Sequence, residues 1–356
     1  MDPKRVVKKG ISVQDSRRRR ESNMTSIRKD KKEEGLAKRR NVAALSYDEP
    51  GLATVGSGEN VVECAAVDIK ELVKMLHSCQ PAERLEGIRK FRRLLSTERN
   101  PPVQICIESG ALPVIVDFLT FFDFPQLQFE AAWALTNIAS TSFTSVVVAH
   151  GAVPSLVSLL SSPSAEVREQ SAWCLGNISG DSAELRDIVL SKGALSPLLA
   201  NLREPANLSL LQNCTWSLSN MCRGKPLPAL STIGPAYSML ASLIQMNVDP
   251  DTTADATWAL SYLSDGDDER ISAVVDLKIV PALVQMLAPG SKPQSIIPAL
   301  RTLGNIVSGT TSFAGSFPEY LILLICRNRV AHAGGGGWWS AQCVCPSTFI
   351  FKEEHP

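Results

Sequence analysis

The stretch Ala-Ala-Trp133-Ala-Leu-Thr-Asn137 decides the fold, because the chain repeats it at a nearly constant spacing. It returns as Ser-Ala-Trp173-Cys-Leu-Gly-Asn177, as Cys-Thr-Trp216-Ser-Leu-Ser-Asn220 and as Ala-Thr-Trp258-Ala-Leu-Ser-Tyr262; a fifth copy, Ala-Leu-Arg301-Thr-Leu-Gly-Asn305, has arginine at the tryptophan position. Successive lead residues lie 40, 43, 42 and 43 positions apart. A unit of this size cannot bury its own apolar faces, so we expect neighbouring units to stack into a solenoid with one continuous core.

A second marker runs in phase and divides each unit into three helices. It reads Gly110-Ala-Leu-Pro113, then Gly151-Ala-Val-Pro154, then Gly193-Ala-Leu-Ser-Pro197. In one unit we expect helices at 144–150, 153–161 and 164–179, with Gly151 between the first two and Ser164 as N-cap of the third. The same marks predict third helices at 81–96, 125–140, 206–222, 250–265 and 292–308. A three-helix unit with a period near 42 predicts an all-α, armadillo-repeat, right-handed α-solenoid.

Charge is distributed unevenly along the chain and defines four regions. Residues 1–45 carry 15 basic and 6 acidic side chains, whereas the rest carries 21 and 30, so the total is neutral. We expect a basic, largely disordered arm at 1–45, a flexible linker at 46–67, armadillo repeats 1–6 at 68–309, and a non-repeat, partly disordered tail at 310–356. The acidic body argues against a nucleic-acid-binding core, and no apolar run reaches the roughly 18 residues that a membrane span needs.

Nothing in the sequence indicates catalysis or a cofactor. The four histidines form no motif with acids or cysteines, and there is no phosphate-binding glycine loop. Asp265-Gly-Asp267-Asp268-Glu269 lacks the full calcium-loop pattern. Cys343-Val-Cys345 has no second ligand pair to complete a metal site, and the nine cysteines lack a disulfide-framework spacing, so we expect reduced thiols. We therefore predict a protein that is not an enzyme and holds neither cofactor nor metal.

The repeated tryptophan and asparagine lie four residues apart and share one helix face. Polar residues three positions before each tryptophan lie on it too: Glu130, Gln170, Asn213 and Asp255. The apolar set Leu135, Ile138, Leu175 and Ile178 faces elsewhere and suits the core. One interpretation is that the tryptophans are simply core residues. Three of them in register with an amide on a polar face favour an exposed ladder instead.

Such a ladder would suit an extended, Lys/Arg-rich peptide. Packed helices would repeat the rungs about every 8–10 Å. Asparagine can hold a peptide backbone, indole faces attract cations, and Asp181 and Asp255 could pair with ammonium heads. The chain's own arm is one such ligand, since Lys38-Arg39-Arg40 can reach back through the linker. The alternative is a disordered tail attracted to nucleic acid or membranes.

These features together resemble the importin alpha family. The arm reads RRRR (17–20), IRKDKK (27–32) and LAKRRNV (36–42), and the repeats read WALTNIAS, WCLGNISGDS, WSLSNMCRGK, WALSYLSDG and LRTLGNIVSGT. The resemblance implies an importin-beta-binding arm with Arg17, Arg18, Arg19, Arg20, Arg28, Lys29, Lys31 and Lys32, and an autoinhibitory segment with Lys38, Arg39 and Arg40. It implies a major groove for nuclear localisation signals with Trp133, Asn137, Ser140, Gln170, Trp173, Asn177, Asp181, Asn213, Trp216 and Asn220. Beyond this groove it places Arg223, Asp255, Trp258 and Tyr262, and it leaves Arg301 and Asn305 as a residual minor groove.

The resemblance implies an adaptor that links signal-bearing cargo to importin-beta and shuttles between cytoplasm and nucleus, without binding nucleic acid directly or inserting into membranes. Three departures stand out. Thr141-Ser142 replaces the usual Gly-Thr, Thr311 replaces an acid, and residues 310–356 do not continue the repeat, as if the chain were truncated after the sixth unit. Export-receptor binding, which the family places in later repeats, is therefore not expected. The alternative function is a non-transport armadillo scaffold for other partners.

Overall fold

The computed structural model describes residues 69–97, 101–288 and 290–309, and all regular structure in these ranges is helical. Residues 69–76 form the first described helix. The third helices of successive units are α3 (Pro81–Leu95), α6 (Pro125–Ala139), α9 (Ala165–Asp181), α12 (Leu208–Cys222), α15 (Pro250–Leu263) and α18 (Pro293–Val307). The predicted third helices are confirmed with ends no more than two residues away.

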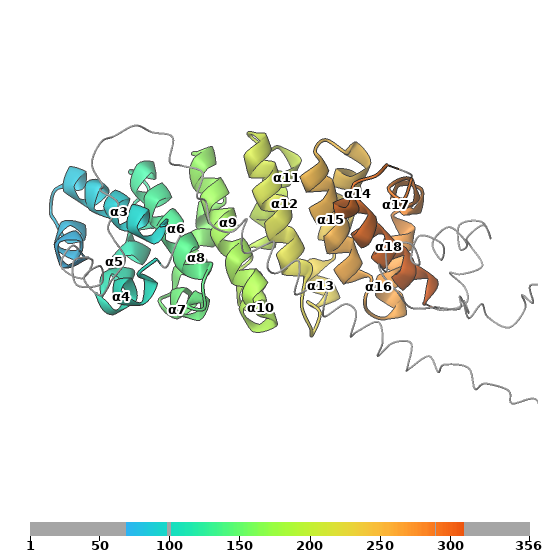
Figure 1. Cartoon of the computed structure of the whole chain (residues 1–356), viewed down its shortest axis with the longest axis horizontal. Coiled ribbons are helices and arrows are strands. Elements are labelled where there is room, and N and C mark those ends of the chain that lie inside the picture. The colour runs from blue at the N-terminus through green and yellow to red at the C-terminus, as the bar shows by residue number, and fades with distance from the viewer. Residues whose placement is uncertain (1–68, 98–100, 289, 310–356) are drawn as a thin grey trace, which may run out of the picture.

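Two shorter helices precede each third helix from α6 onward. The first helices are α4 (Val103–Glu108), α7 (Thr144–Ala149), α10 (Ala183–Ser191), α13 (Leu230–Ile233) and α16 (Asp268–Asp276). The second helices are α5 (Ala111–Phe118), α8 (Ala152–Leu159), α11 (Leu195–Arg203), α14 (Ala236–Met246) and α17 (Val280–Gln285). The units follow one another along the long axis of the molecule, from α3 at one end to α18 at the other (Figure 1). This is the armadillo-type solenoid predicted from the period.

Local sequence explains where the helices begin. Ser164 caps α9, because its side chain accepts a hydrogen bond from the Val167 amide. Asn207 does the same for α12 and Asp249 for α15. Such caps satisfy amides that have no partner within the helix. The predicted cap at Ser164 is confirmed.

Four of the five described junctions between a first and a second helix contain a left-handed residue; the junction between α13 and α14, at Gly234, does not. Gly110, Gly151 and Gly193 have φ values of 76°, 78° and 80° there, which glycine adopts without steric cost. Lys278 occupies the same place before α17, with φ 53°. The glycine marker of the sequence is therefore a backbone requirement at these three junctions, and the sixth unit meets it with a residue less suited to it.

One hydrophobic core runs the length of the solenoid, from Ile69 to Ile306. Each third helix packs on the third helices before and after it, and each second helix packs on the third helix of its own unit. The predicted core positions Leu135, Leu175 and Ile178 are 0% exposed. The stacked third helices thus form a continuous wall that carries the repeated tryptophans.

Several further predictions concern parts or properties of the chain other than the stacked third helices. The arm, the linker and the tail from 310 onward lie outside the described residues, so the four regional boundaries stay predictions. Cys79, Cys106, Cys174, Cys214 and Cys222 are free thiols. Within the described ranges no helix is long and apolar enough to cross a membrane, and no group of three potential metal-ligating side chains is found there.

Candidate functional site

The predicted ladder lies on consecutive third helices. Trp133 is on α6, Trp173 on α9, Trp216 on α12 and Trp258 on α15, and Arg301 follows on α18. These five helices stand side by side along the solenoid (Figure 1). Regular stacking therefore brings the repeated residues into one line.

The expectation of an exposed ladder is wrong for its two outer tryptophans. Trp133 and Trp258 are each only 6% exposed, whereas Trp173 and Trp216 are half-buried. The Arg92 guanidinium lies 4.2 Å from the Trp133 ring centroid. Trp258 stacks on Tyr262 with 5.8 Å between ring centroids. Arg92, which lies outside the repeated motif, thus covers Trp133, whereas Trp258 packs on Tyr262, which occupies the asparagine position of its own copy of the motif.

The asparagines are also less accessible than predicted. Asn137, Asn177 and Asn220 are at most 4% exposed. The Nδ2 group of Asn177 donates to the Thr136 carbonyl at 3.1 Å, and that of Asn220 donates to the Gly176 carbonyl at 3.0 Å. Each amide therefore joins its own third helix to the preceding one. The Asn177 Oδ1 atom is buried and accepts no hydrogen bond from the described residues.

The polar residues beside the tryptophans are engaged within the protein, contrary to their predicted place on a ligand-facing surface. Glu130 is 6% exposed and its Oε2 accepts a 2.8 Å hydrogen bond from Arg92. Gln170 donates to Thr136 Oγ1 at 2.8 Å, and Asn213 donates to Glu169 Oε1 at 2.9 Å. Asp255 is half-buried. Ser140 is buried and donates to the Asn137 carbonyl. Glu130, Gln170 and Asn213 thus hold neighbouring repeats together, whereas Ser140 bonds within the end of its own helix.

Asp181 differs from this engaged set. It is the last residue of α9, it is exposed, and it forms no ion pair with another described residue. The carbonyl of the preceding residue, Gly180, accepts a hydrogen bond from Arg223 Nη2 at 2.8 Å. The helix end beside Trp173 is thus fixed, while its carboxylate stays open to solvent. The predicted exposure of Asp181 is confirmed.

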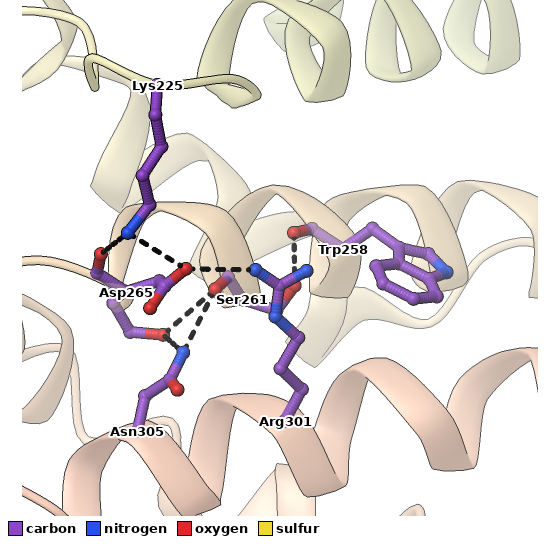
Figure 2. Close-up of polar contacts among 7 residues, drawn as sticks. Lys225, Trp258, Ser261, Asp265, Arg301 and Asn305 are labelled. Carbon is purple, nitrogen blue, oxygen red and sulfur yellow. Dashed lines mark hydrogen bonds and ion pairs between the residues drawn. The ribbon is translucent and has the colours of Figure 1, made fainter. Parts of the chain in front are cut away.

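The far end of the ladder is a closed polar cluster (Figure 2). Asp265 Oδ2 lies 3.2 Å from Arg301 Nη2 and 3.5 Å from Lys225 Nζ. Arg301 also lies over Tyr262, 4.9 Å from the ring centroid. Asn305 Nδ2 donates to the Ser261 carbonyl and to Ser264 Oγ, each at 3.1 Å. Arg301 and Asn305 were expected to begin a minor groove. In the structure Arg301 binds Asp265, and Asn305 binds the C-terminal end of α15.

The comparisons with known proteins agree with this architecture. The importin beta binding domain family matches residues 7–89, and the armadillo/beta-catenin-like repeat family matches residues 99–140, 142–180, 182–223 and 267–308. Importin subunit alpha-1a of Oryza sativa subsp. japonica is 49% identical over 304 residues, which are 85% of this chain and 57% of that protein. The chain belongs to the importin alpha family. Importin subunit alpha-2 of Arabidopsis thaliana is 48% identical over 79% of this chain and 53% of its own length.

The chain thus spans a little over half the length of these importin alpha relatives. Among solved structures, a designed armadillo repeat protein in complex with the peptide (KR)4 matches 67% of this chain and 99% of its own. Its TM-score is 0.61 and its sequence identity is 26%. A second engineered protein matches with a TM-score of 0.66 and 28% identity, over 79% of this chain and 72% of its own.

Sequence reasoning missed a pair of buried arginines in this importin alpha chain. Arg186 on α10 is 0% exposed and donates to the carbonyls of Arg223 at 2.7 Å and Pro226 at 2.8 Å. Arg270 on α16 donates to the Pro228 carbonyl. Together they clamp residues 223–228, which carry Arg223 and Lys225 toward the ladder. The signal in the sequence was an arginine at the same place in two units, five residues after Asp181 and five residues after Asp265.

The buried cysteines take no part in this chemistry. Desolvation raises the pKa of the Cys106, Cys174 and Cys214 thiols to about 12. They are therefore neutral near pH 7, and a thiol is a poor nucleophile or metal ligand until it ionises.

Proposed function

We propose that this chain binds Lys/Arg-rich nuclear localisation signals along its third helices and links such cargo to importin-beta for nuclear import. The observation that carries the proposal is the pairing of two half-buried tryptophans, Trp173 and Trp216, with the exposed carboxylate of Asp181 at the end of α9. Indole faces and a carboxylate together select a cation on a long aliphatic stem. The likeness to a designed armadillo protein in complex with (KR)4 supports the same ligand class.

The centre of the proposed groove lies between α9 and α12. The Trp173 and Trp216 indoles take the methylene stems of lysine or arginine, and Asp181 takes the key ammonium group. The Asn177 Oδ1 atom, which is buried and accepts no hydrogen bond from the described part of the chain, accepts one from the peptide backbone. The other family positions, Trp133, Asn137, Asn213 and Asn220, contribute chiefly by fixing the helices that carry these groups.

The basic arm completes the proposed adaptor. Arg17 to Arg20, Arg28, Lys29, Lys31 and Lys32 bind importin-beta, in keeping with the match of residues 7–89 to the importin beta binding domain family. Lys38, Arg39 and Arg40 occupy the groove when importin-beta is absent. The chain then moves between cytoplasm and nucleus with its cargo.

A peptide titration tests the groove. The full chain is titrated with a Lys/Arg-rich signal peptide and with a scrambled peptide of the same composition, and a Trp173→Ala variant is measured beside Phe124→Ala. Phe124 is exposed in the loop before α6, away from the line of tryptophans. We expect the signal peptide to bind more tightly and only Trp173→Ala to weaken it. Equal binding of both peptides would favour the alternative, a non-transport armadillo scaffold.

A further inference from the structure

One face of the Trp133 indole is already covered by a cation of this chain. The Cζ atom of Arg92, which lies on α3 one unit earlier, is 4.2 Å from the Trp133 ring centroid. The Arg92 side chain is 13% exposed, and Trp133 is 6% exposed. This is the geometry expected for a ligand lysine or arginine over an indole, made here by the protein itself.

The guanidinium is held in place by Glu130, one turn before Trp133 on α6. Arg92 Nε lies 2.8 Å from Glu130 Oε2, and Nη2 lies 3.5 Å from Oε1. Arg89 Nε approaches the same carboxylate at 3.5 Å. Two donors from one planar group restrict its orientation more than a lysine could. The Glu130 side chain is only 8% exposed, so its charge needs this partner.

A similar arrangement is found at the opposite end of the ladder. Arg301 lies over Tyr262 at 4.9 Å and binds Asp265 at 3.2 Å, with its side chain 10% exposed. Between these ends, Trp173 is half-buried and no arginine or lysine of the described ranges lies over it. Each end of the aromatic series is thus covered by an arginine that an acid holds, whereas Trp173 has no such cover from the described residues.

We infer that Arg92 is an end stop, which closes the Trp133 end of the ladder to ligand cations and so limits how many consecutive basic residues the groove recognises. This inference rests on the proposed function. A ligand cation on that face of Trp133 would have to displace the guanidinium, and displacement would leave Glu130 buried with a poorer partner. Like-charge repulsion from Arg92 and Arg89 opposes the same step. A ligand with a longer run of basic residues therefore gains no affinity from Trp133.

The test uses the full chain and the peptides (KR)2, (KR)3 and (KR)4, each flanked by Gly-Ser, with Kd measured at physiological salt. Arg92→Ala is compared with wild type and with Arg93→Ala. Arg93 is the neighbouring residue on α3, is exposed, and makes no contact with Trp133, so its variant carries the same change of charge. In the Arg92→Ala variant, one face of the Trp133 indole is uncovered and Glu130 has lost the arginine that lies closest to it.

We expect the gain in affinity from (KR)3 to (KR)4 to be about three- to tenfold larger in Arg92→Ala than in wild type, the range of one added cation–indole contact. Arg93→Ala should match wild type. The double variant Arg92→Ala/Trp133→Leu should lose the added gain. If Arg92→Ala proves unstable, Arg92→Ala/Glu130→Gln removes the buried lone charge and should still show a larger gain than Glu130→Gln alone.

An unchanged gain in both Arg92 variants would overturn the end stop. If the gain in affinity from (KR)3 to (KR)4 rose equally in Arg93→Ala, the effect would come from overall charge. If the larger gain persisted in Arg92→Ala/Trp133→Leu, it would come from a site other than Trp133. Either result also rejects the inference. The proposed function is judged separately by Trp173→Ala. Binding that Trp173→Ala weakens, with length gains identical in all variants, rejects only the end stop, whereas binding indifferent to Trp173 rejects both.

Discussion

Each asparagine of the repeat joins two helices by a single side-chain amide. Asn177 reaches the residue before Asn137 in the preceding unit, and Asn220 reaches the residue before Asn177. The regular spacing of these amides therefore has a structural cause that does not depend on any ligand. The Asp181 carboxylate takes no part in this packing and is left open to solvent.

Asp181→Lys should abolish binding of a basic signal without unfolding the chain. The side chain is exposed at the end of α9, so the fold tolerates the change, while the new ammonium group stands where the ligand's lysine must lie. Loss of a close charge pair alone costs about 2–5 kcal/mol of binding free energy. Peptide titration and a circular-dichroism melt measure the two effects. Asp117→Lys, an exposed residue on α5, reverses the same charge and should leave affinity unchanged.

Gly176→Ala should displace the Trp216 indole. A Cβ atom at this position would lie 2.5 Å from Trp216 Cζ3, which is far inside van der Waals contact. Overpacking of this kind typically costs about 1–3 kcal/mol of stability. We expect a lower melting temperature together with altered tryptophan fluorescence and weaker peptide binding. Unchanged fluorescence would mean that Trp216 does not rest against Gly176 in solution.

The sequence was sufficient to place the site but not to describe its accessibility. The period of the Trp and Asn residues correctly put them in line on successive third helices, because a helix repeats its faces regularly. It could not show that Trp133 is covered, since Arg92 lies outside the repeated motif and meets the indole only after α3 and α6 pack. For the same reason Asp265 looked like part of an incomplete calcium loop and proved to be the partner of Lys225 and Arg301.

At the scale of elements, first helices hold the loop that borders the ladder. Arg186→Lys should loosen residues 223–228, because an ammonium group cannot reproduce the fork that reaches the Arg223 and Pro226 carbonyls. A buried acceptor left without a partner costs about 1–3 kcal/mol. Limited proteolysis in this loop and thermal unfolding report the change. Arg203→Lys, at the exposed end of α11, is the matched control and should behave as wild type.

Lys278→Gly should stabilise the sixth unit. Lys278 has φ 53°, where three other units have glycine, and a left-handed backbone costs a residue with a Cβ atom about 1–2 kcal/mol. Glycine removes that cost but loses more entropy on folding, so we expect a net gain of about 0.5–1 kcal/mol in the free energy of unfolding. Lys278→Ala keeps the Cβ atom and should bring no such gain. If it stabilised equally, the lysine side chain and not the backbone would be responsible.

At the scale of the whole molecule, the repeat explains the fold almost completely. The ends of the third helices were predictable to within two residues in all six units, and those of the first and second helices in the one unit predicted, because caps, glycines and prolines mark many of them. The continuous core from Ile69 to Ile306 follows from stacking. Charge is a second feature of the whole chain, since residues 1–45 carry a net charge of +9 and the remaining residues carry a net charge of −9. Opposite net charges favour attraction between the two parts.

Removing the arm's Lys38-Arg39-Arg40 segment should tighten signal binding. A tethered segment has an effective concentration of order mM at the groove. If the segment itself bound with a Kd of about 0.1 mM, it would mask the groove about tenfold. We therefore expect the triple variant Lys38→Ala/Arg39→Ala/Arg40→Ala to bind a signal peptide up to about tenfold more tightly than wild type, with importin-beta adding little further.

A second triple variant separates this mechanism from a general effect of charge. Arg28→Ala/Lys29→Ala/Lys31→Ala removes the same three charges from the part of the arm assigned to importin-beta. If autoinhibition is local, this variant should keep the affinity of wild type for the signal peptide and lose affinity for importin-beta. If both triple variants tighten signal binding equally, the arm acts through its overall positive charge, and raising the salt concentration should then abolish the difference from wild type, because screening weakens long-range attraction between exposed charges. A local segment that fills the indole slots would keep part of its effect at high salt, since contact between alkyl stems and indoles does not depend on ionic strength.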